Sequence, residues 1–328
     1  MNKIKLIMKK PIKFSFSFLT LTVLFLIGMT SCGNSGLVPV VKTVSLTSVT
    51  AASISCRGNV TSDGGSTIKT RGVCWGTKPN PTTSNSKTTS SVGTGEYVCL
   101  LSGLITDTKY YVRAYATNSS GTSYGEEQSF TTLLADVDGN VYKTVTIGTQ
   151  VWMAENLRTT KYRNGNLISK ITDPTAWASQ TTGAYCNYDN STSNYTTYGY
   201  LYNWYAATDA RFIAPTGWHI PTQAEWTTLM NYLGGASVAG PVLMDTGNSY
   251  WTGSFTGATN TSGFTALPGG CLFAPTGSSY GFGNITTSGV WWSTLDSNTN
   301  NTLLISNGVA SLNTLSKNSG CSVRCIRD

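Results

Sequence analysis

The stretch GWHIPTQAEWTTL, residues 217–229, contains the one histidine of this 328-residue chain, directly before a helix start. Thr222 and Glu225 have the spacing of a capping box, in which the threonine hydroxyl accepts from the Glu225 amide and the carboxylate reaches back to the Thr222 amide. Apolar residues then recur at helical spacing up to Gly-Gly at 234–235: Trp226, Leu229, Met230 and Leu233. We predict a strand-to-helix corner that His219 holds by hydrogen bonding; a catalytic histidine is the alternative.

The charges of the chain are few and concentrated at its start. Charged residues make up 11% of the chain, with 22 Lys and Arg against 15 Asp and Glu. Five of the lysines precede an apolar run at about 14–29, and this order is typical of a signal peptide, which we assign to residues 1–31. Without them 17 basic and 15 acidic residues remain, so the net charge falls from +7 to +2. No basic run remains to indicate a nucleic-acid partner.

The sequence Met29-Thr-Ser-Cys32 closes this segment and resembles a bacterial lipobox, although the pattern prefers leucine where Met29 stands. The resemblance implies lipidation of Cys32, with residues 32–37 as a tether. Acyl chains contribute about 0.8 kcal/mol per buried methylene, so they would hold the mature chain on a membrane. We therefore expect a cell-envelope protein, anchored to the outer membrane by lipid alone. An ordinary secreted protein is the alternative.

Residues 38–134 alternate in short stretches such as VKTVSLT, AASISCRG and KYYVRAYATN, separated by turn residues. This period-2 pattern predicts an antiparallel β-sandwich without helices. The segment LSGLITDTKYYVRAYATN resembles the end of a fibronectin type III domain, with Leu104 and Tyr110 in the places of a tyrosine corner and Thr106 in the place of the usual proline. The resemblance implies a spacer or a binding module.

Three cysteines fall in this first module: Cys56, Cys74 and Cys99. Because three cannot all pair within one domain, we expect buried unpaired thiols, with one internal disulfide as the alternative.

The second module, residues 136–328, opens with DVDGN. An EF-hand loop is excluded because the glycine comes too early and no glutamate follows at the twelfth loop position. The sequence after DVDGN instead predicts a β-hairpin, with strands at 141–147 and 150–154 joined by a turn at 148–149. We expect no metal or cofactor, since one histidine cannot build a histidine-rich metal site. A calcium site of scattered carbonyls is the alternative.

Several phrases of this module occur in a characteristic order: IGTQVWMAENLRTTKYRNG, YGYLYNWYAA, GWHIPTQAEW, GFTALPGG and SVRCIRD. In that order they resemble the Fibrobacter succinogenes major paralogous domain over essentially all of residues 136–328. That family is in turn similar to the formylglycine-generating fold and to C-type lectin domains. The resemblance implies a loop-rich α+β domain with two short helices and a twisted antiparallel sheet. The whole chain is thus expected to be mainly β, with an α+β second module.

Four cysteines of the second module allow three pairings into two disulfides. Cys186 and Cys325 lie in phrases that the resembled family shares, which favours that pair and leaves Cys271 with Cys321. The formylglycine-generating enzyme uses a cysteine pair near its chain end, but its spacing upstream of the terminal cysteine is absent here. We therefore expect no catalysis. An enzyme of that type or a carboxylate-based hydrolase is the alternative.

Many aromatic residues lie between residues 177 and 205, with several asparagines among them. We expect the segment NYDNSTSNYTTYG at 187–199 to be exposed. Aromatic faces stack on sugars, and the same mixture forms protein-binding surfaces. The candidate ligand contacts are Trp177, Tyr188, Asn190, Tyr195 and Tyr198. We expect a non-catalytic module that binds a glycan or a surface protein; a purely structural envelope component is the third hypothesis.

Overall fold

The computed structural model describes residues 36–246, 250–252, 257–273, 281–294 and 301–328. The expected signal peptide and lipidated Cys32 lie outside the described residues. Gly36–Asp328 form one compact unit. Within the described part, every helix is too short or too polar to cross a lipid bilayer.

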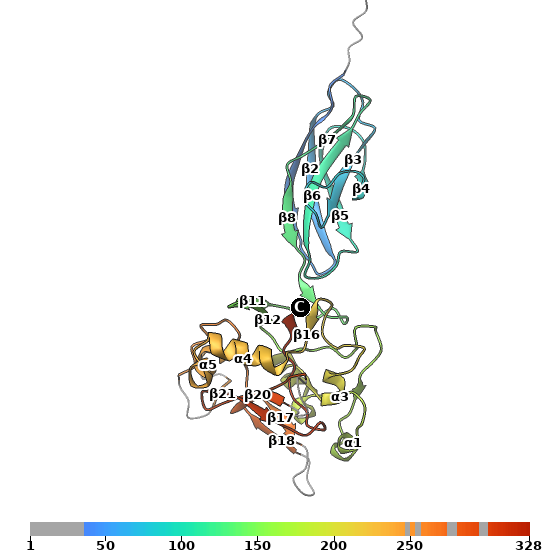
Figure 1. Cartoon of the computed structure of the whole chain (residues 1–328). Helices are drawn as coiled ribbons and strands as arrows, with labels where there is room; N and C mark the ends of the chain where they lie inside the picture. Colours follow the sequence, from blue (N-terminus) through green and yellow to red (C-terminus); the bar gives the residue numbers. More distant parts are fainter. Residues whose placement is uncertain (1–35, 247–249, 253–256, 274–280, 295–300) are drawn as a thin grey trace, which may run out of the picture. The chain divides into compact units, whose positions relative to one another are not determined.

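The first module consists of two antiparallel sheets, as the alternating pattern predicted (Figure 1). One sheet has the order β1 (Val40–Thr47), β2 (Ser53–Ser62), β5 (Gly95–Ser102). The other has the order β4 (Ser86–Ser90), β3 (Thr70–Gly76), β6 (Lys109–Thr117), β7 (Thr122–Tyr124), and β8 (Gln128–Thr131) also pairs with β6. In β2, β5 and most of β6, alternate residues are buried in the core of the module, so the prediction of a β-sandwich is confirmed.

The predicted tyrosine corner is present. The Tyr110 hydroxyl accepts a hydrogen bond from the backbone N–H of Ile105 at 3.0 Å. Its ring stacks on Phe130 with centroids 5.7 Å apart, and Leu104 is buried beside it. The corner therefore joins the turn at residues 103–107 to strand β6.

The three cysteines of the sandwich are buried free thiols, as expected. Cys56 on β2 lies opposite Cys99 on β5. Burial, with Cys99 and Cys74 nearby, raises the pKa of Cys56 to about 12. These thiols act as small apolar core residues.

The second module begins earlier in the chain than its first hairpin. Strand β9 (Leu134–Ala135) pairs with β10 (Val141–Tyr142), and Leu134 packs in the same core cluster as Tyr142. The predicted strand 141–147 is two strands, because Lys143 interrupts it before β11 (Thr144–Ile147). Sheet order is β11, β12 (Gln150–Met153), β22 (Ile326–Arg327), β16 (Trp218–His219). The chain end thus lies between the first hairpin and the corner that contains the histidine.

Two further sheets complete the module. The smaller has the order β13 (Ser169–Lys170), β14 (Ala184–Cys186), β15 (Leu201–Tyr202). The larger has the order β18 (Gly281–Ile285), β17 (Gly269–Phe273), β19 (Ser288–Trp292), β20 (Asn301–Ser306), β21 (Val309–Thr314).

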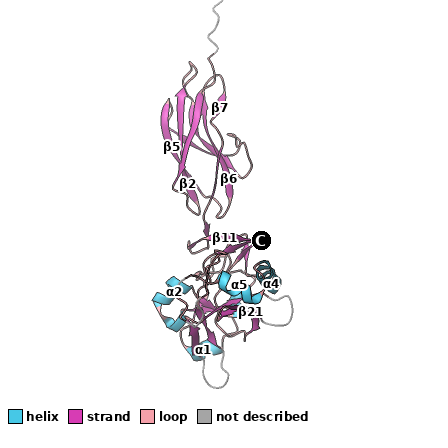
Figure 2. Cartoon of the chain, turned by 90° about the vertical axis from the view of Figure 1, so that its left-hand side faces the viewer, coloured by secondary structure: helices cyan, strands magenta, loops and turns pink. Residues whose placement is uncertain are grey.

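The helices of this module are short and lie around the strands (Figure 2). In the described residues they are α1 (Pro174–Ala178), α2 (Thr192–Tyr198), α3 (Trp204–Ala207), α4 (Gln223–Tyr232), α5 (Ala236–Leu243) and the 3₁₀ turn η1 (Tyr188–Asn190). The module therefore combines helices and strands, with more helices than the two that the family resemblance implied.

The core of the second module contains a fully buried arginine, Arg324. Its guanidinium binds the side-chain oxygen of Asn156 and the carbonyl oxygens of Met153, Phe264 and Thr265. It also lies over the Phe264 ring, 4.4 Å from the centroid. Burial lowers the pKa of Arg324 to about 9, so the group remains a cation at neutral pH. No motif in the sequence indicates this role for Arg324.

The DVDGN segment is a hydrogen-bonded turn. The Asp136 carboxylate accepts from the backbone N–H groups of Asp138 and Asn140, both at 3.0 Å, and from the hydroxyl of Tyr142. The Asp138 carboxylate accepts from Thr160 and pairs with Lys161 at 2.9 Å. Protein donors therefore occupy both carboxylates, and no group of metal ligands occurs among the described residues.

Candidate functional site

The corner that contains His219 is built as the capping motif predicts. The Glu225 amide donates to the Thr222 hydroxyl at 3.2 Å, and the Glu225 carboxylate accepts from the Thr222 amide at 2.8 Å. The same carboxylate lies 2.9 Å from His219 Nε2, while His219 Nδ1 lies 2.7 Å from the side chain of Asp328. The histidine therefore joins the start of α4 to Asp328 through its two ring nitrogens.

Two carboxylates set the protonation state of His219. The hydrogen bond to Glu225 raises the pKa of the imidazole most, and Asp328 raises it further against the opposing effect of burial. Burial alone would raise the pKa of Glu225, but the hydrogen bonds from His219 and Thr222 lower it. Both ring nitrogens lie within hydrogen-bond distance of a carboxylate, and a protonated imidazole can donate through both of them.

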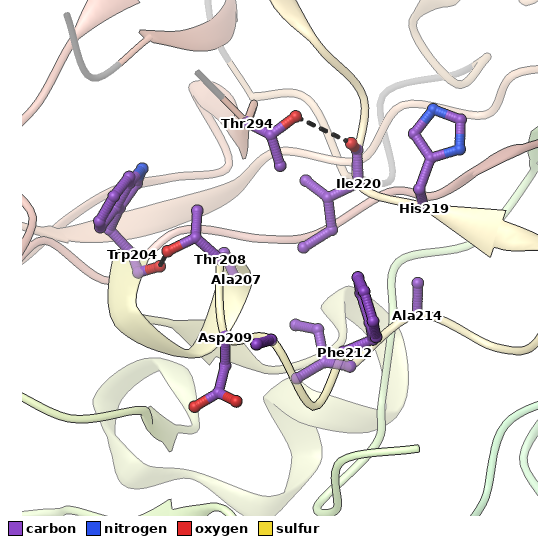
Figure 3. Close-up of a pocket in the computed structure, with 11 residues that line it drawn as sticks. Trp204, Ala207, Thr208, Asp209, Phe212, Ala214, His219, Ile220 and Thr294 are labelled. Carbon is purple, nitrogen blue, oxygen red and sulfur yellow. Dashed lines mark hydrogen bonds between the residues drawn. The ribbon is translucent and has the colours of Figure 1, made fainter. Parts of the chain in front are cut away.

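Beside this corner lies a pocket of about 350 Å³ (Figure 3). Thr208, Asp209, His219 and Thr294 supply polar groups at its wall. The other named side chains are apolar: Trp204, Ala207, Phe212, Ile213, Ala214 and Ile220. In Figure 3, Trp204 and Phe212 lie on opposite sides of the pocket. Ligand sites are commonly of this size and composition, with few polar groups among apolar ones.

Helix α3 positions Trp204 at this pocket. The Asn203 side chain caps the helix by accepting from the Ala206 amide at 2.9 Å, and Trp204 follows at the first helical position. The indole Nε1 of Trp204 is buried and has no hydrogen-bond partner among the described residues. Lys317 lies over the ring, 4.2 Å from its centroid. A buried donor without a partner is uncommon in folded proteins and calls for an explanation.

Phe212 has an unfavourable backbone conformation at the pocket. Its φ is +56°, a region that bulky L-residues rarely adopt, and 53% of the residue is exposed. The Phe212 amide donates to the Asp209 carbonyl at 2.9 Å, and its carbonyl accepts from the Arg163 amide at 2.7 Å. The Arg163 guanidinium also lies 4.9 Å from the ring centroid. Surrounding groups thus hold an exposed aromatic ring in a strained conformation, as is frequent at binding sites.

The charges at the pocket are paired. Arg211 binds the carboxylate of Asp209 through two nitrogens, at 2.8 and 2.7 Å. This hydrogen-bonded pair lowers the pKa of Asp209. His219 likewise faces two carboxylates, those of Glu225 and Asp328.

Two of the predicted ligand contacts are wrong. Trp177 is 1% exposed and Tyr188 is 6% exposed, and both pack with Leu201 and Leu272 in one core cluster. The Trp177 indole donates to the carbonyl of Asn318 at 2.7 Å. The segment expected to be an exposed loop folds into η1 and α2 over this cluster, so its first aromatic residue is turned inward.

The remaining three candidates lie nearer to the surface. The exposed Asn190 uses its amide to donate to the carbonyl of Thr172 at 3.0 Å. Tyr195 is half-buried and stacks on Tyr200, with centroids 5.0 Å apart and an interplanar angle of 17°. Tyr198 is also half-buried and meets another tyrosine edge-on. None of the three lines the pocket beside His219.

The structure contains no disulfide among the described cysteines. Cys186 packs in the cluster of Trp177, whereas Cys325 packs in another cluster with Trp218. The Cys186–Cys325 bond is therefore not found, because the fold directs the two side chains into different parts of the core. Cys271 and Cys321 are in contact, with Sγ atoms 3.2 Å apart, although they too are free thiols.

No motif in the sequence indicates the pocket itself. Trp204 belongs to the phrase YGYLYNWYAA, which supported only the family resemblance, and Phe212 lies in a segment without a motif. The one sequence feature that could have indicated an exposed ring is the position of Phe212, between Arg211 and Ile213 in a turn-like segment. The alternation of polar and apolar residues does not distinguish such a phenylalanine from a core residue. Only the packing of α3 against residues 212–220 brings these side chains together.

Comparison with known proteins finds one family. The family model of the Fibrobacter succinogenes major domain matches residues 145–327. No curated protein matches the chain.

Similar solved structures cover about the length of the first module. The sensor domain of the anti-sigma factor RsgI4 in Pseudobacteroides cellulosolvens is 18% identical, over 30% of this chain and 96% of that one, with a TM-score of 0.24. The fibronectin type-III domain of human fibronectin type III domain containing protein 3 is 22% identical, over 31% of this chain and 91% of that one, with a TM-score of 0.21.

Proposed function

We propose a non-catalytic binding function for this chain, which belongs to the Fibrobacter succinogenes major domain family. The ligand is a surface protein that inserts one uncharged, apolar side chain into the pocket beside His219. The observation that carries this proposal is the pocket of about 350 Å³ between Trp204 and Phe212. Such apolar concavities with a few polar groups are the usual form of a binding site.

The wall of the pocket suits a peptide segment in particular. An apolar side chain would bury against Ala207, Ile213 and Ile220, which gains about 25 cal/mol per Å² of apolar surface removed from water. The hydroxyls of Thr208 and Thr294 at the wall donate to backbone carbonyls and would accept from backbone N–H groups of the ligand. The exposed Phe212 ring would pack on the ligand beside the inserted side chain.

The absence of catalysis is part of the proposal. General-base catalysis by a histidine needs a ring nitrogen that can take a proton at the operating pH. His219 instead faces Glu225 and Asp328 with its two ring nitrogens. The cysteines named above are buried, and a thiolate is needed for nucleophilic attack.

Glycan binding is the second candidate, and one observation favours it. Tyr195 and Tyr200 are half-buried and nearly parallel, so their outer edges form an aromatic surface of the kind that stacks on sugar rings. This surface is distinct from the pocket, so the two candidates can be separated by mutation.

Two arrays distinguish the candidates. A peptide array that varies one aliphatic or aromatic residue tests the pocket, and a glycan array tests the tyrosine surface. The variant Ala207→Phe fills the pocket with a larger side chain, while Tyr195→Ala removes the outer ring. We expect peptide binding that Ala207→Phe reduces at least tenfold and Tyr195→Ala leaves unchanged. Peptide binding that is insensitive to Ala207→Phe, or saturable binding to glycans alone, contradicts the proposal.

We also propose that the chain acts as a lipoprotein of the outer membrane, tethered through Cys32. The lipobox-like sequence at 29–32 supports this. Incorporation of labelled palmitate into the expressed protein tests it. We expect labelling in the wild type and none in Cys32→Ala; equal labelling of both proteins contradicts the anchor.

A further inference from the structure

We propose that Cys271 and Cys321 are an oxidation site, at which one disulfide forms while the chain folds and ties the C-terminal segment to β17. Their Sγ atoms already lie 3.2 Å apart, and both side chains are fully buried. This inference concerns the assembly of the second module and is independent of the proposed ligand.

The backbone around the two cysteines has the register that a cross-strand disulfide requires. The amide of Leu272 donates to the carbonyl of Gly320 at 2.9 Å, and the Gly320 amide donates back at 2.7 Å. This is an antiparallel hydrogen-bonded pair. Cys271 precedes Leu272 and Cys321 follows Gly320, so in this antiparallel pairing the two cysteines lie opposite each other as a non-hydrogen-bonded pair. The Cα atoms of such a pair are about 4.5 Å apart. Disulfides span Cα separations of about 4.4–6.8 Å, so no strand has to move.

Cys321 is held on its other side as well. Its amide donates to the carbonyl of Tyr202 at 3.0 Å, and the Tyr202 amide donates to the Cys321 carbonyl at 2.9 Å. The cysteine thus lies between β15 and β17, and its side chain has one thiol within contact distance. Cys186 and Cys325, by contrast, lie in separate core clusters.

Burial determines when the bond can form. Burial, with the neighbouring Cys271, raises the pKa of the Cys321 thiol well above its ordinary value, so the folded, reduced pair holds little thiolate. The thiolate is the reactive species, and a bulky oxidant cannot reach a fully buried sulfur. Oxidation therefore precedes the final docking of the C-terminal segment.

The reaction is a thiol–disulfide exchange with an oxidised disulfide, either a protein or a small molecule. One cysteine thiolate attacks a sulfur of the oxidant, forms a mixed disulfide and releases one thiolate. The second cysteine thiolate attacks the protein sulfur of that bond, forms the Cys271–Cys321 disulfide and releases the other thiolate. The oxidant gains two electrons, and the two cysteine protons end on the released thiols.

The disulfide would stabilise the docked position of the C-terminal segment. Cys321 precedes Arg324 and Ile326, which the core of the module binds. A disulfide restricts the unfolded chain and so favours the docked state.

Peptide mapping tests the pairing directly. The full chain is refolded from denaturant in a buffer of reduced and oxidised glutathione, alkylated, and digested with trypsin without reduction. Cleavage after Lys170, Arg211, Lys317 and Arg324 places the four cysteines in four different peptides. We expect peptide 212–317 joined to peptide 318–324, with two hydrogens fewer than the separate peptides. Peptide 171–211 joined to peptide 325–327, or four alkylated cysteines, overturns the proposal.

Stability gives a second, independent measurement. We expect the oxidised chain to unfold at a higher urea midpoint than the same chain after reduction with dithiothreitol. Cys321→Ala abolishes this difference, whereas the matched variant Cys325→Ala retains it. An equal difference in both variants, or none in the wild type, contradicts a Cys271–Cys321 bond.

Discussion

The Nη2 and Nε atoms of Arg324 lie 2.7 and 2.9 Å from the side-chain oxygen of Asn156. Both residues are buried, so a single amide oxygen and three backbone carbonyls replace water around a full positive charge. We predict that Arg324→Ala lowers the unfolding free energy of the second module by about 3 kcal/mol or more, because buried acceptors lose their donor and a cavity forms. Urea unfolding followed by tryptophan fluorescence measures this, since eight of the nine tryptophans lie after residue 136.

Arg324→Lys is the matched control for this prediction. It keeps the charge but cannot reproduce the planar fork of donors, so we expect an intermediate loss. Equal stability of Arg324→Ala and the wild type would show that the guanidinium contributes nothing.

The tyrosine corner supplies a prediction for the sandwich. Tyr110→Phe removes only the hydroxyl that accepts from the Ile105 amide. We expect a loss of about 1 kcal/mol and faster hydrogen exchange at the Ile105 amide, because that N–H loses its acceptor. Tyr111→Phe on the same strand serves as the control. Unchanged exchange at Ile105 in Tyr110→Phe would disprove the role of the corner.

The pair of carboxylates around His219 makes stability depend on pH. The folded state raises the pKa of His219 above its ordinary value of 6.5, so this contribution is complete below pH 6.5 and is lost as the pH rises through the folded pKa. The side chain is 34% exposed, and solvent screening limits the effect to about 1 kcal/mol or less. Urea midpoints between pH 6 and 9 measure it.

We expect His219→Gln to flatten this alkaline loss, since His219 is the one histidine of the chain. On the acid side the folded state lowers the pKa of Glu225, so its contribution is lost as the pH falls through that value. An identical alkaline slope in the wild type and in His219→Gln would rule out this assignment.

The strained Phe212 should be more important for binding than for stability. Phe212→Gly removes the ring but relieves a positive φ that costs about 1 kcal/mol or more. We therefore expect the unfolding free energy to change by less than about 1 kcal/mol, while peptide binding at the pocket weakens. Ile213→Ala is the contrast, because this buried neighbour should lose about 2–5 kcal/mol. A large loss of stability in Phe212→Gly would show that the ring stabilises the fold, contrary to this prediction.

Short-range patterns predicted the local structure well. The capping box at Thr222 and Glu225 involves residues three apart, so the helix start could be anticipated. The alternation of the first module and the position of Tyr110 predicted the sandwich and its corner for the same reason. The aromatic segment at 187–199 was predicted less well, because exposure depends on what packs against it.

The sequence by itself determined the order of the modules, the strands of the sandwich and the corner before α4, because these depend on neighbours within a few residues. Only the tertiary structure decided which thiols meet, which aromatic rings are buried and that Trp204 and Phe212 flank one pocket. These relations join residues that are distant in the chain, such as Cys271 with Cys321 and Asn156 with Arg324. Such contacts depend on how the sheets and the C-terminal segment pack, and no local spacing encodes that arrangement.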